Sequence, residues 1–289
     1  MRQSASPYRY DVRMVLRAPA REARTAAARP DDLITPIERG LGVLAAFRQG
    51  DEWLGNQEIA QRTNIPKATI TRLTQTLAAE GFLNHCAQRR KYRLAPAVLT
   101  LGFASAHHTD FAASARLLVQ KFSDDCGVFA ALANRAGLDT AIVGSCHSAA
   151  TLMTLALSDG AQFPIAGSPF GLALLAGLPE GEREYLLDRI RLRCPTEHRI
   201  AIRQRVADAL EQVGQKGYYA AAGDWGDEMV VAAAPLVVPD RPAFVVGCAA
   251  PSSVLPRAKL VELVGPRLVS LAETLCSLMR GNAQGLGHA

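Results

Sequence analysis

The apolar residues from 36 to 47 recur at helical spacing and predict a first helix. Pro36 suits its first turn, where no backbone N–H donor is needed. Its inward face is expected to carry Ile37, Leu41, Leu44 and Phe47. A short second helix is predicted next, with Asn56 as its N-cap and with Ile59 and Ala60 directed inward.

A third helix is predicted after Pro66, because Ile70, Leu73 and Leu77 recur at spacings i, i+3 and i+7. Gly81 ends it as a typical C′ residue. The polar residues left on its other faces are Lys67, Thr69, Thr71, Arg72, Gln75 and Thr76. A tight turn joins the second and third predicted helices, and the third carries these polar residues. This arrangement indicates a helix-turn-helix unit that places one helix in a DNA groove.

A basic hairpin is predicted to follow as a wing, with short strands at 82–83 and 92–94. Its tip carries Arg89, Arg90 and Lys91, which suit a phosphate backbone or a minor groove. A solvated basic loop is the alternative, but the neighbouring helix-turn-helix favours DNA. The expected DNA contacts are Lys67, Thr69, Thr71, Arg72, Gln75, Thr76, Arg89, Arg90 and Lys91.

The remaining pattern predicts a linker helix and then a larger domain. Three structured parts are expected: 33–95, 96–110 and 111–281. The linker helix carries Val98, Leu99, Leu101 and Phe103, whose apolar side needs cover from a second copy of the chain or from its own wing. Helices are expected at 111–125, 170–176, 180–191, 199–216 and 256–279, and strands at 128–132, 141–146, 151–157, 229–236 and 243–249. Without a regular β-α-β repeat, this mixture predicts an α+β sensor domain.

Composition narrows the class of protein. The 289 residues suit two modest domains, and no apolar run approaches the roughly 18 residues that span a bilayer. The 32 Lys and Arg residues exceed the 27 Asp and Glu residues only slightly, but basic residues cluster in the winged unit. The six cysteines are dispersed, which favours reduced thiols in a cytoplasmic protein that binds no membrane.

The two chain ends differ from the rest. Arginines scattered among Ala, Ser and Pro predict a disordered basic arm over residues 1–32, which could add non-specific DNA affinity. The same composition also resembles an organelle transit peptide, and Met14 could be the true start. Residues 282–289 are expected to form a loose tail.

Catalytic and metal-binding motifs are not found. The adjacent pair Cys146-His147 would point to opposite faces of a strand, which is the wrong geometry for a thiolate–imidazole pair. His85-Cys86 has no second pair nearby that could complete a metal site. We therefore expect no enzymatic activity, no metal and no cofactor.

These motifs together resemble the IclR family of bacterial transcription regulators. The resemblance runs from about residue 35 to 278 and is carried by the segments 37–41, 58–60, 65–69, 72–73, 76–77, 92–96, 101–102, 163–165, 171–176, 216–218 and 233–236. It implies a winged N-terminal domain, a linker helix and a C-terminal GAF-like domain that binds a small organic effector. It also implies a homodimer or homotetramer on a palindromic operator in double-stranded DNA.

The resemblance also implies where the effector binds. The corresponding residues are Pro169, Phe170, Asp224, Trp225, Gly247, Cys248 and Ala249. Phe170 and Trp225 as pocket walls would favour a planar or aromatic organic acid, although both could equally be core aromatics. The chain departs from the family at Ala68, where serine is common, and at Leu172, where lysine is common.

Two functions remain open at this point. The first is a ligand-responsive regulator that acts as a repressor or an activator. The second is an architectural DNA-binding protein whose C-terminal domain only oligomerises.

Overall fold

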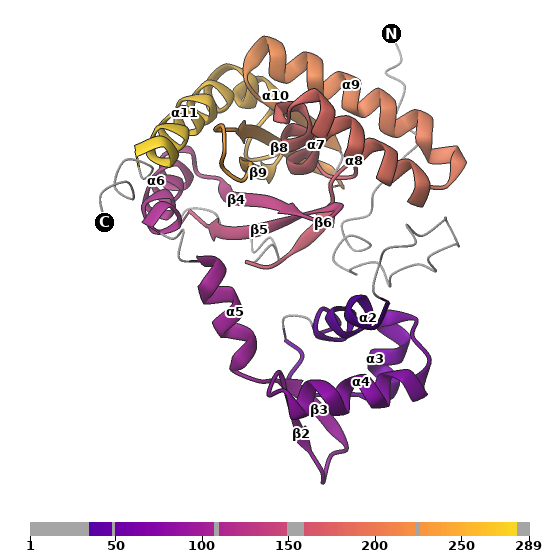
Figure 1. Cartoon of the computed structure of the whole chain (residues 1–289). Helices are drawn as coiled ribbons and strands as arrows, with labels where there is room; N and C mark the ends of the chain where they lie inside the picture. Colours follow the sequence, from indigo (N-terminus) through magenta and orange to yellow (C-terminus); the bar gives the residue numbers. More distant parts are fainter. Residues whose placement is uncertain (1–34, 48–49, 107–109, 149–158, 224–225, 282–289) are drawn as a thin grey trace. The chain divides into compact units, whose positions relative to one another are not determined.

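The computed structural model describes residues 35–281 except 48–49, 107–109, 149–158 and 224–225. The described residues form two compact units, one over 35–106 and the other over 110–281 (Figure 1). The basic arm expected at 1–32, the tail expected at 282–289 and the strand expected at 151–157 lie outside the described residues.

The first unit is a winged helix-turn-helix, as the helical spacing predicts. Its elements are α2 (Thr35–Leu44), β1 (Leu54–Gly55), α3 (Asn56–Thr63), α4 (Lys67–Ala79), β2 (Leu83–Cys86), β3 (Lys91–Leu94) and α5 (Ala97–Ala106). The three strands form an antiparallel sheet in the order β1-β3-β2. The core of this unit contains Val43, Ala46, Leu54, Ile59, Ile65, Ile70, Leu83 and Tyr92.

The inward face of α2 differs from the prediction. Ile37 and Leu41 are 58% and 61% exposed, whereas Val43 is fully buried in the core. Leu44 and Phe47 do pack partly against that core. Helical spacing places Ile37 and Leu41 on one face but does not say what covers it, so their predicted burial is wrong.

The predicted cap of α3 is also wrong. Gly55 is the N-cap, and its backbone N–H donates to the Glu58 side chain at 2.7 Å. Asn56 is already inside the helix, where its side-chain amide donates to the Thr71 hydroxyl at 3.1 Å. The Asn56 side chain, which the local pattern assigned to the cap, is therefore hydrogen-bonded to Thr71 on α4, fifteen residues away.

The second unit is built on a six-stranded sheet in the order β6-β5-β4-β9-β8-β7, with every neighbouring pair antiparallel. Its strands are β4 (Phe129–Ala136), β5 (Asp139–Cys146), β6 (Gln162–Pro164), β7 (Tyr219–Gly223), β8 (Gly226–Leu236) and β9 (Phe244–Pro251). Its longer helices are α6 (Asp110–Cys126), α7 (Pro169–Gly177), α8 (Glu180–Arg193), α9 (Arg199–Lys216) and α11 (Gly265–Gly281). The sequence pattern did not predict β6 or β7, which are short or rich in alanine.

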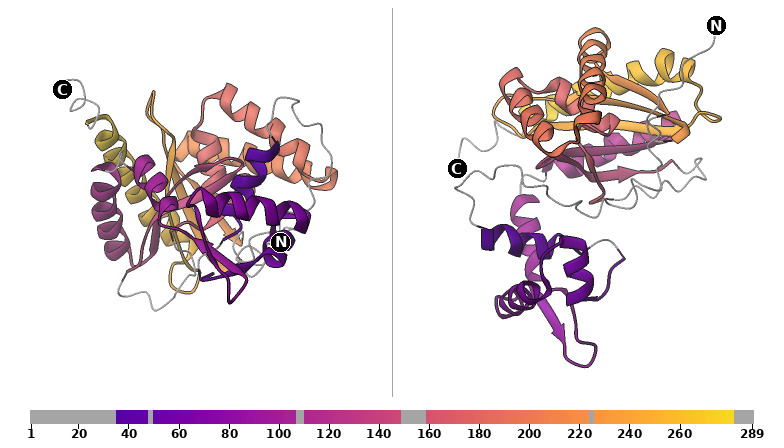
Figure 2. Two further views of the ribbon diagram at one scale, coloured as in Figure 1. Left: turned by 60° about the horizontal axis from the view of Figure 1, so that its bottom comes forward. Right: turned by 90° about the vertical axis from the view of Figure 1, so that its right-hand side faces the viewer.

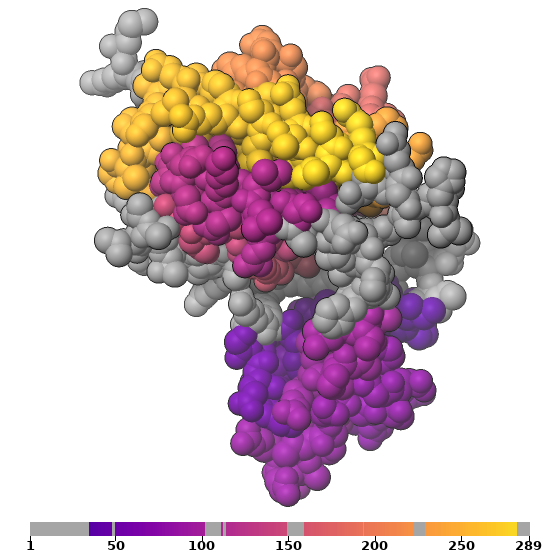
Figure 3. Space-filling view, turned by 90° about the vertical axis from the view of Figure 1, so that its left-hand side faces the viewer, coloured from indigo at the N-terminus to yellow at the C-terminus, as the bar shows by residue number. Residues whose placement is uncertain are grey.

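Helices cover both faces of this sheet, and each face has its own core. Helices α6 and α11 lie side by side over one face (Figure 3), and α7, α8 and α9 cover the other (Figures 1 and 2). Because side chains alternate along a strand, β9 sends Val246, Cys248 and Ala250 to the first core and Val245 and Ala249 to the second. The α+β prediction for this unit is confirmed.

The predicted closing helix over 256–279 is interrupted. A short helix, α10 (Arg257–Lys259), leads into a π-helical segment at Leu260–Val264 before α11 begins. Tyr218 lies so close to Gly265 that a Cβ at residue 265 would collide with its ring. The Tyr218 hydroxyl also donates to the Val261 carbonyl at 3.3 Å, so the irregular turn is held by a residue that lies between α9 and β7.

Candidate DNA-binding surface and effector site

The second helix of the helix-turn-helix, α4, has one buried and one exposed side. Ile70 and Thr74 are buried against the core. Lys67, Arg72, Gln75 and Thr76 are exposed, and Thr69 and Thr71 are partly buried. The exposed side therefore offers two cations, an amide and a hydroxyl, which are groups that contact phosphates and base edges.

Thr71 and Thr74 have structural partners. The Thr71 hydroxyl accepts from the Asn56 amide at 3.1 Å and donates to the Lys67 carbonyl at 3.0 Å. The Thr74 hydroxyl lies 2.9 Å from the Ile70 carbonyl and 3.3 Å from the Asn56 side-chain oxygen. Asn56 therefore fixes α3 against α4, a role that the sequence pattern did not reveal.

Two cations of the first unit are used within the fold. Arg62 forms an ion pair with Asp51 and donates to the Ala46 carbonyl at 2.9 Å. Lys91 lies 3.3 Å from the Glu58 carboxylate. The backbone N–H of Gly55 and then Lys91 lower the pKa of Glu58. Lys91 begins β3 rather than occupying the wing tip, so its expected place at the tip is corrected.

The wing tip lies between β2 and β3 and presents Arg89 and Arg90. Arg90 adopts a left-handed backbone conformation with φ 50°, which closes the turn. The guanidinium of Arg89 lies 5.7 Å from the centre of the Trp53 ring, and that of Arg93 lies 5.0 Å from it. Within the described residues, none of these three arginines forms an ion pair, and neither do Lys67 and Arg72 on α4. Trp53 was missed because a lone aromatic before a two-residue strand carries no motif.

The expected effector residues on α7 and β9 lie partly together. Pro169 and Phe170 begin α7, where the Ser168 side chain caps the helix by accepting the Gly171 N–H at 3.0 Å. Phe170 is buried with Ala249 in the same core. Its ring also packs directly against Gly247.

Cys248 lies on the other face of the sheet. Its side chain belongs to the core beneath α6 and α11, so it cannot share a pocket wall with Phe170. Full burial raises the pKa of the Cys248 thiol to about 12. The expected placement of Cys248 beside Phe170 is therefore wrong, because consecutive strand residues alternate between faces. The other two expected residues, Asp224 and Trp225, lie outside the described residues.

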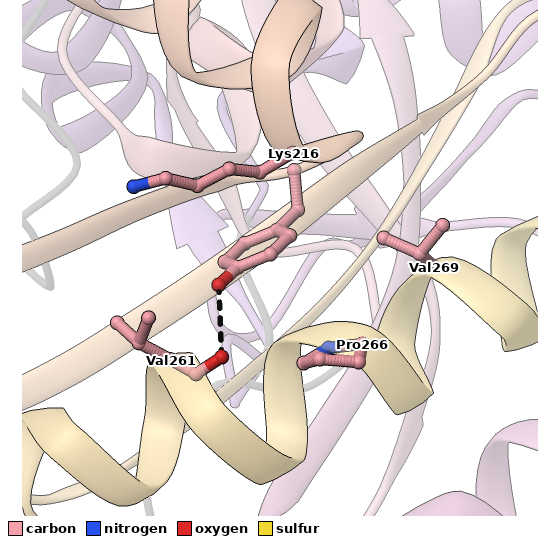
Figure 4. A pocket seen from close by; sticks show the side chains of 5 residues that line it. Lys216, Val261, Pro266 and Val269 are labelled. Atoms are coloured by element: carbon pink, nitrogen blue, oxygen red, sulfur yellow. Dashed lines mark hydrogen bonds between the residues drawn. The ribbon is translucent and has the colours of Figure 1, made fainter.

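A hollow of about 430 Å³ occurs elsewhere in the second unit, beside the π-helical segment (Figure 4). It is lined by Lys216, Tyr218, Val261, Pro266 and Val269. Its walls are mainly apolar, and it contains none of the effector residues expected from the sequence.

Cys146 ends β5 and His147 follows it directly, and their side chains point to opposite faces of the sheet, as predicted. Cys146 belongs to the core beneath α6 and α11, and burial raises the pKa of its thiol. The His147 ring lies 5.0 Å from the ring of Phe129, which belongs to the opposite core. In the described part of the chain, no cluster of three metal-ligating side chains occurs. Among the described helices, none combines the length and the apolar character needed to cross a membrane.

Comparison with protein families accounts for both units. Residues 36–85 match the IclR helix-turn-helix domain, and residues 103–276 match the bacterial transcriptional regulator IclR C-terminal domain. The chain belongs to the IclR family. Its resemblance to that family, inferred from sequence motifs, is thereby confirmed, and the family consists of transcription regulators rather than enzymes.

Individual relatives agree with this assignment. The HTH-type transcriptional regulator TsaQ1/TsaQ2 of Comamonas testosteroni is 26% identical over 86% of this chain and 89% of its own length. The crystal structure of an IclR family regulator from Brucella abortus is 35% identical, with a TM-score of 0.72 over 86% of this chain and 93% of that one. An IclR homologue from Microbacterium hydrocarbonoxydans, crystallised with 4-hydroxybenzoate, is 19% identical, with a TM-score of 0.64 over 85% of this chain and 99% of that one.

Proposed function

We propose that this IclR-family protein is a ligand-responsive, sequence-specific DNA-binding regulator of transcription. In this proposal α4 enters the major groove of the operator, with Arg72 and Gln75 at base edges and Lys67 at a phosphate. The wing arginines contact the flanking backbone. The observation that carries the proposal is the exposed side of α4, whose cations have no ion-pair partner among the described residues.

The contributions of the threonines are expected to differ. Thr69 and Thr76 remain proposed DNA contacts, since a threonine methyl can meet a thymine methyl. Thr71 is proposed to act mainly by holding α3 against α4, because its hydroxyl is already bonded to Asn56 and to the Lys67 carbonyl.

The effector is proposed to be a small organic acid, with aromatic acids the first class to test. It would bind on the α7 side of the sheet, near Pro169, Phe170, Gly247 and Ala249, and the resemblance adds Asp224 and Trp225 as expected contacts. The 4-hydroxybenzoate bound by the Microbacterium hydrocarbonoxydans homologue supports this class of ligand without fixing it. Cys248 is left out of this proposed site, because its side chain lies in the core on the other face of the sheet.

The protein is further proposed to act as a homodimer or homotetramer. A palindromic operator requires two recognition helices about one helical turn apart, roughly 34 Å. Helix α5 exposes Leu99 and Leu101 by 64% and 57%, and α2 exposes Ile37 and Leu41. Apolar surface of this kind is stabilised when a second copy covers it.

Selection of bound sequences from a random DNA pool, followed by a thermal-shift screen of organic acids, tests the proposal. We expect enrichment of a palindrome and a ligand that raises the melting temperature, because binding to the folded state alone stabilises it. The ligand should change operator affinity by about 1–3 kcal/mol, and Trp225→Ala should abolish that change while retaining DNA binding.

Each failure has a distinct meaning. A pool without any enriched sequence would contradict sequence-specific binding. An enriched palindrome without any stabilising ligand would favour the architectural protein whose C-terminal unit only oligomerises.

A further inference from the structure

We propose that Trp53 is a positioning residue for DNA binding, whose indole holds the guanidinium groups of Arg89 and Arg93 ready for phosphate contacts. This inference rests on the proposed DNA-binding function. It adds a residue outside the recognition helix and outside the wing hairpin to the DNA-binding surface.

The sheet register brings the three side chains together. Strand β1 pairs antiparallel with β3, with Leu54 opposite Tyr92 and Gly55 opposite Lys91. Extending this register by one residue places Trp53 opposite Arg93, and the ring centre lies 5.0 Å from that guanidinium. The turn before β3 returns Arg89 to the same ring at 5.7 Å.

The indole is itself held in place. Its Nε1–H donates to the Glu52 carboxylate at 3.0 Å. Leu54, the next residue, is buried in the core and anchors the backbone at this point. The two arginines therefore contact a ring whose direction is fixed by a hydrogen bond and by a neighbouring core residue.

An aromatic partner leaves the arginines able to bind phosphate. A guanidinium lying over an indole is attracted by the ring and keeps its in-plane N–H donors available. Lys91 and Arg62 are held differently, since Glu58 and Asp51 engage their donors and neutralise their charge. Trp53 thus orders two long side chains without occupying their N–H donors, and the Glu52 carboxylate beside the ring bonds the indole N–H.

The expected effect is on affinity and not on sequence preference. Immobilising long side chains opposes binding, so arginines ordered before DNA arrives bind more tightly. Phosphate contacts carry no sequence information. Trp53 should therefore raise the affinity for a duplex of random sequence and for the selected operator by the same factor. The number of phosphates contacted, and hence the salt dependence, should stay the same without the ring.

The test compares Trp53→Leu with the conservative Trp53→Phe and with the double variant Arg89→Ala/Arg93→Ala. On both duplexes, Trp53→Leu should bind at least about fivefold more weakly, the lower end of the cost of ordering two long side chains. Trp53→Phe should retain most of the affinity, because phenylalanine also attracts a guanidinium. Adding Trp53→Leu to the double arginine variant should cause no further loss.

Three results would overturn the inference. Trp53→Leu could bind like the wild type while the double arginine variant is weaker. The loss of DNA affinity caused by Trp53→Leu could add in full to the loss caused by the double arginine variant. Trp53→Phe could also bind DNA as weakly as Trp53→Leu. A wild-type protein that binds neither duplex would instead contradict the proposed function itself.

A folding defect in Trp53→Leu would be recognised from its melting temperature. In that case the tryptophan emission of the wild type is followed during titration with random-sequence duplex. We expect a change in emission that Trp53→Phe removes, because phosphates arrive beside the arginines on that ring. An emission change that persists unaltered in Trp53→Phe, or no change at all, would contradict the inference.

Discussion

The ring of Phe170 packs on the backbone of Gly247, and a Cβ atom at residue 247 would lie 2.6 Å from its Cζ atom. The same Cβ would lie 2.9 Å from the Ala232 carbonyl oxygen. Helix α7 therefore meets β9 through direct contact between an aromatic ring and main chain. No space is left for a ligand between the Phe170 ring and Gly247, so a ligand on this side of the sheet must contact another part of the ring.

Gly247→Ala should consequently destabilise the second unit. Overpacking a filled core typically costs about 1–3 kcal/mol, and the added methyl group would collide with a buried ring and with a backbone oxygen. Urea unfolding would measure the loss. Gly144→Ala is the matched control on β5, since a Cβ there meets nothing within 4 Å. Equal stability of the two variants would contradict the packing described.

Arg72→Ala on α4 should weaken binding to the selected operator by about 1–3 kcal/mol if the guanidinium contacts a base. Lys67→Ala should weaken operator and random duplexes about equally, because a phosphate contact is sequence-independent. Gel-shift titrations would measure both effects. Lys216→Ala removes an exposed cation from the second unit and serves as the control. Unchanged operator affinity in both α4 variants, with folding intact, would reject α4 as the recognition helix.

Replacing Arg89, Arg90 and Lys91 together with alanine should flatten the log–log salt dependence by about 0.9 for each phosphate that the wing no longer neutralises. The structure adds an order among them. Lys91→Ala alone should change the slope less than Arg89→Ala, because Glu58 already partners the Lys91 ammonium at 3.3 Å. Affinities measured over a range of salt concentrations would show this. A slope that the triple variant leaves unaltered would mean that the wing does not contact DNA.

Glu58 predicts a pH dependence of stability in the first unit. The Gly55 N–H and Lys91 lower its folded-state pKa from 4.5. Its stabilising contribution is therefore complete above that value and is lost as pH falls through the lowered pKa. Glu58→Gln should unfold with a weaker pH dependence in this acidic range, and Glu80→Gln, at an exposed carboxylate, should resemble the wild type. A pH profile unchanged by Glu58→Gln would contradict the assignment.

Light scattering should show a species larger than the 30.9 kDa chain. Leu99→Glu combined with Leu101→Glu should shift the protein toward the monomer, because charges would then replace two exposed apolar side chains of α5 that a second copy is proposed to cover. Leu117→Glu, at an exposed leucine of α6, is the control. A wild-type protein that is monomeric at micromolar concentration would contradict the proposed assembly.

Local spacing was sufficient to predict α3, α4 and the wing, because their apolar residues face a small core formed by neighbours in sequence. The errors arose where a distant residue decides the outcome. The Asn56 side chain is hydrogen-bonded to Thr71 instead of capping α3. The closing helix is interrupted where Tyr218 packs against Gly265. Cys248 is a different case, because strand alternation alone separates it from Gly247 and Ala249. The family resemblance implied one site for Gly247, Cys248 and Ala249, which the alternation of side chains along a strand does not allow.

The central strands of the second unit are rich in buried alanine, including Ala130, Ala131 and Ala133 on β4 and Ala232, Ala233 and Ala234 on β8. These small side chains lie in both cores, between the sheet and the helices that cover it, and added methyl groups there are expected to crowd the close-packed interior. Larger side chains at these alanines are therefore expected to destabilise the second unit. Related proteins that share the scaffold have room to diverge mainly in its loops and on the outer sides of its helices, so new specificities are expected to arise there while the sheet stays nearly constant.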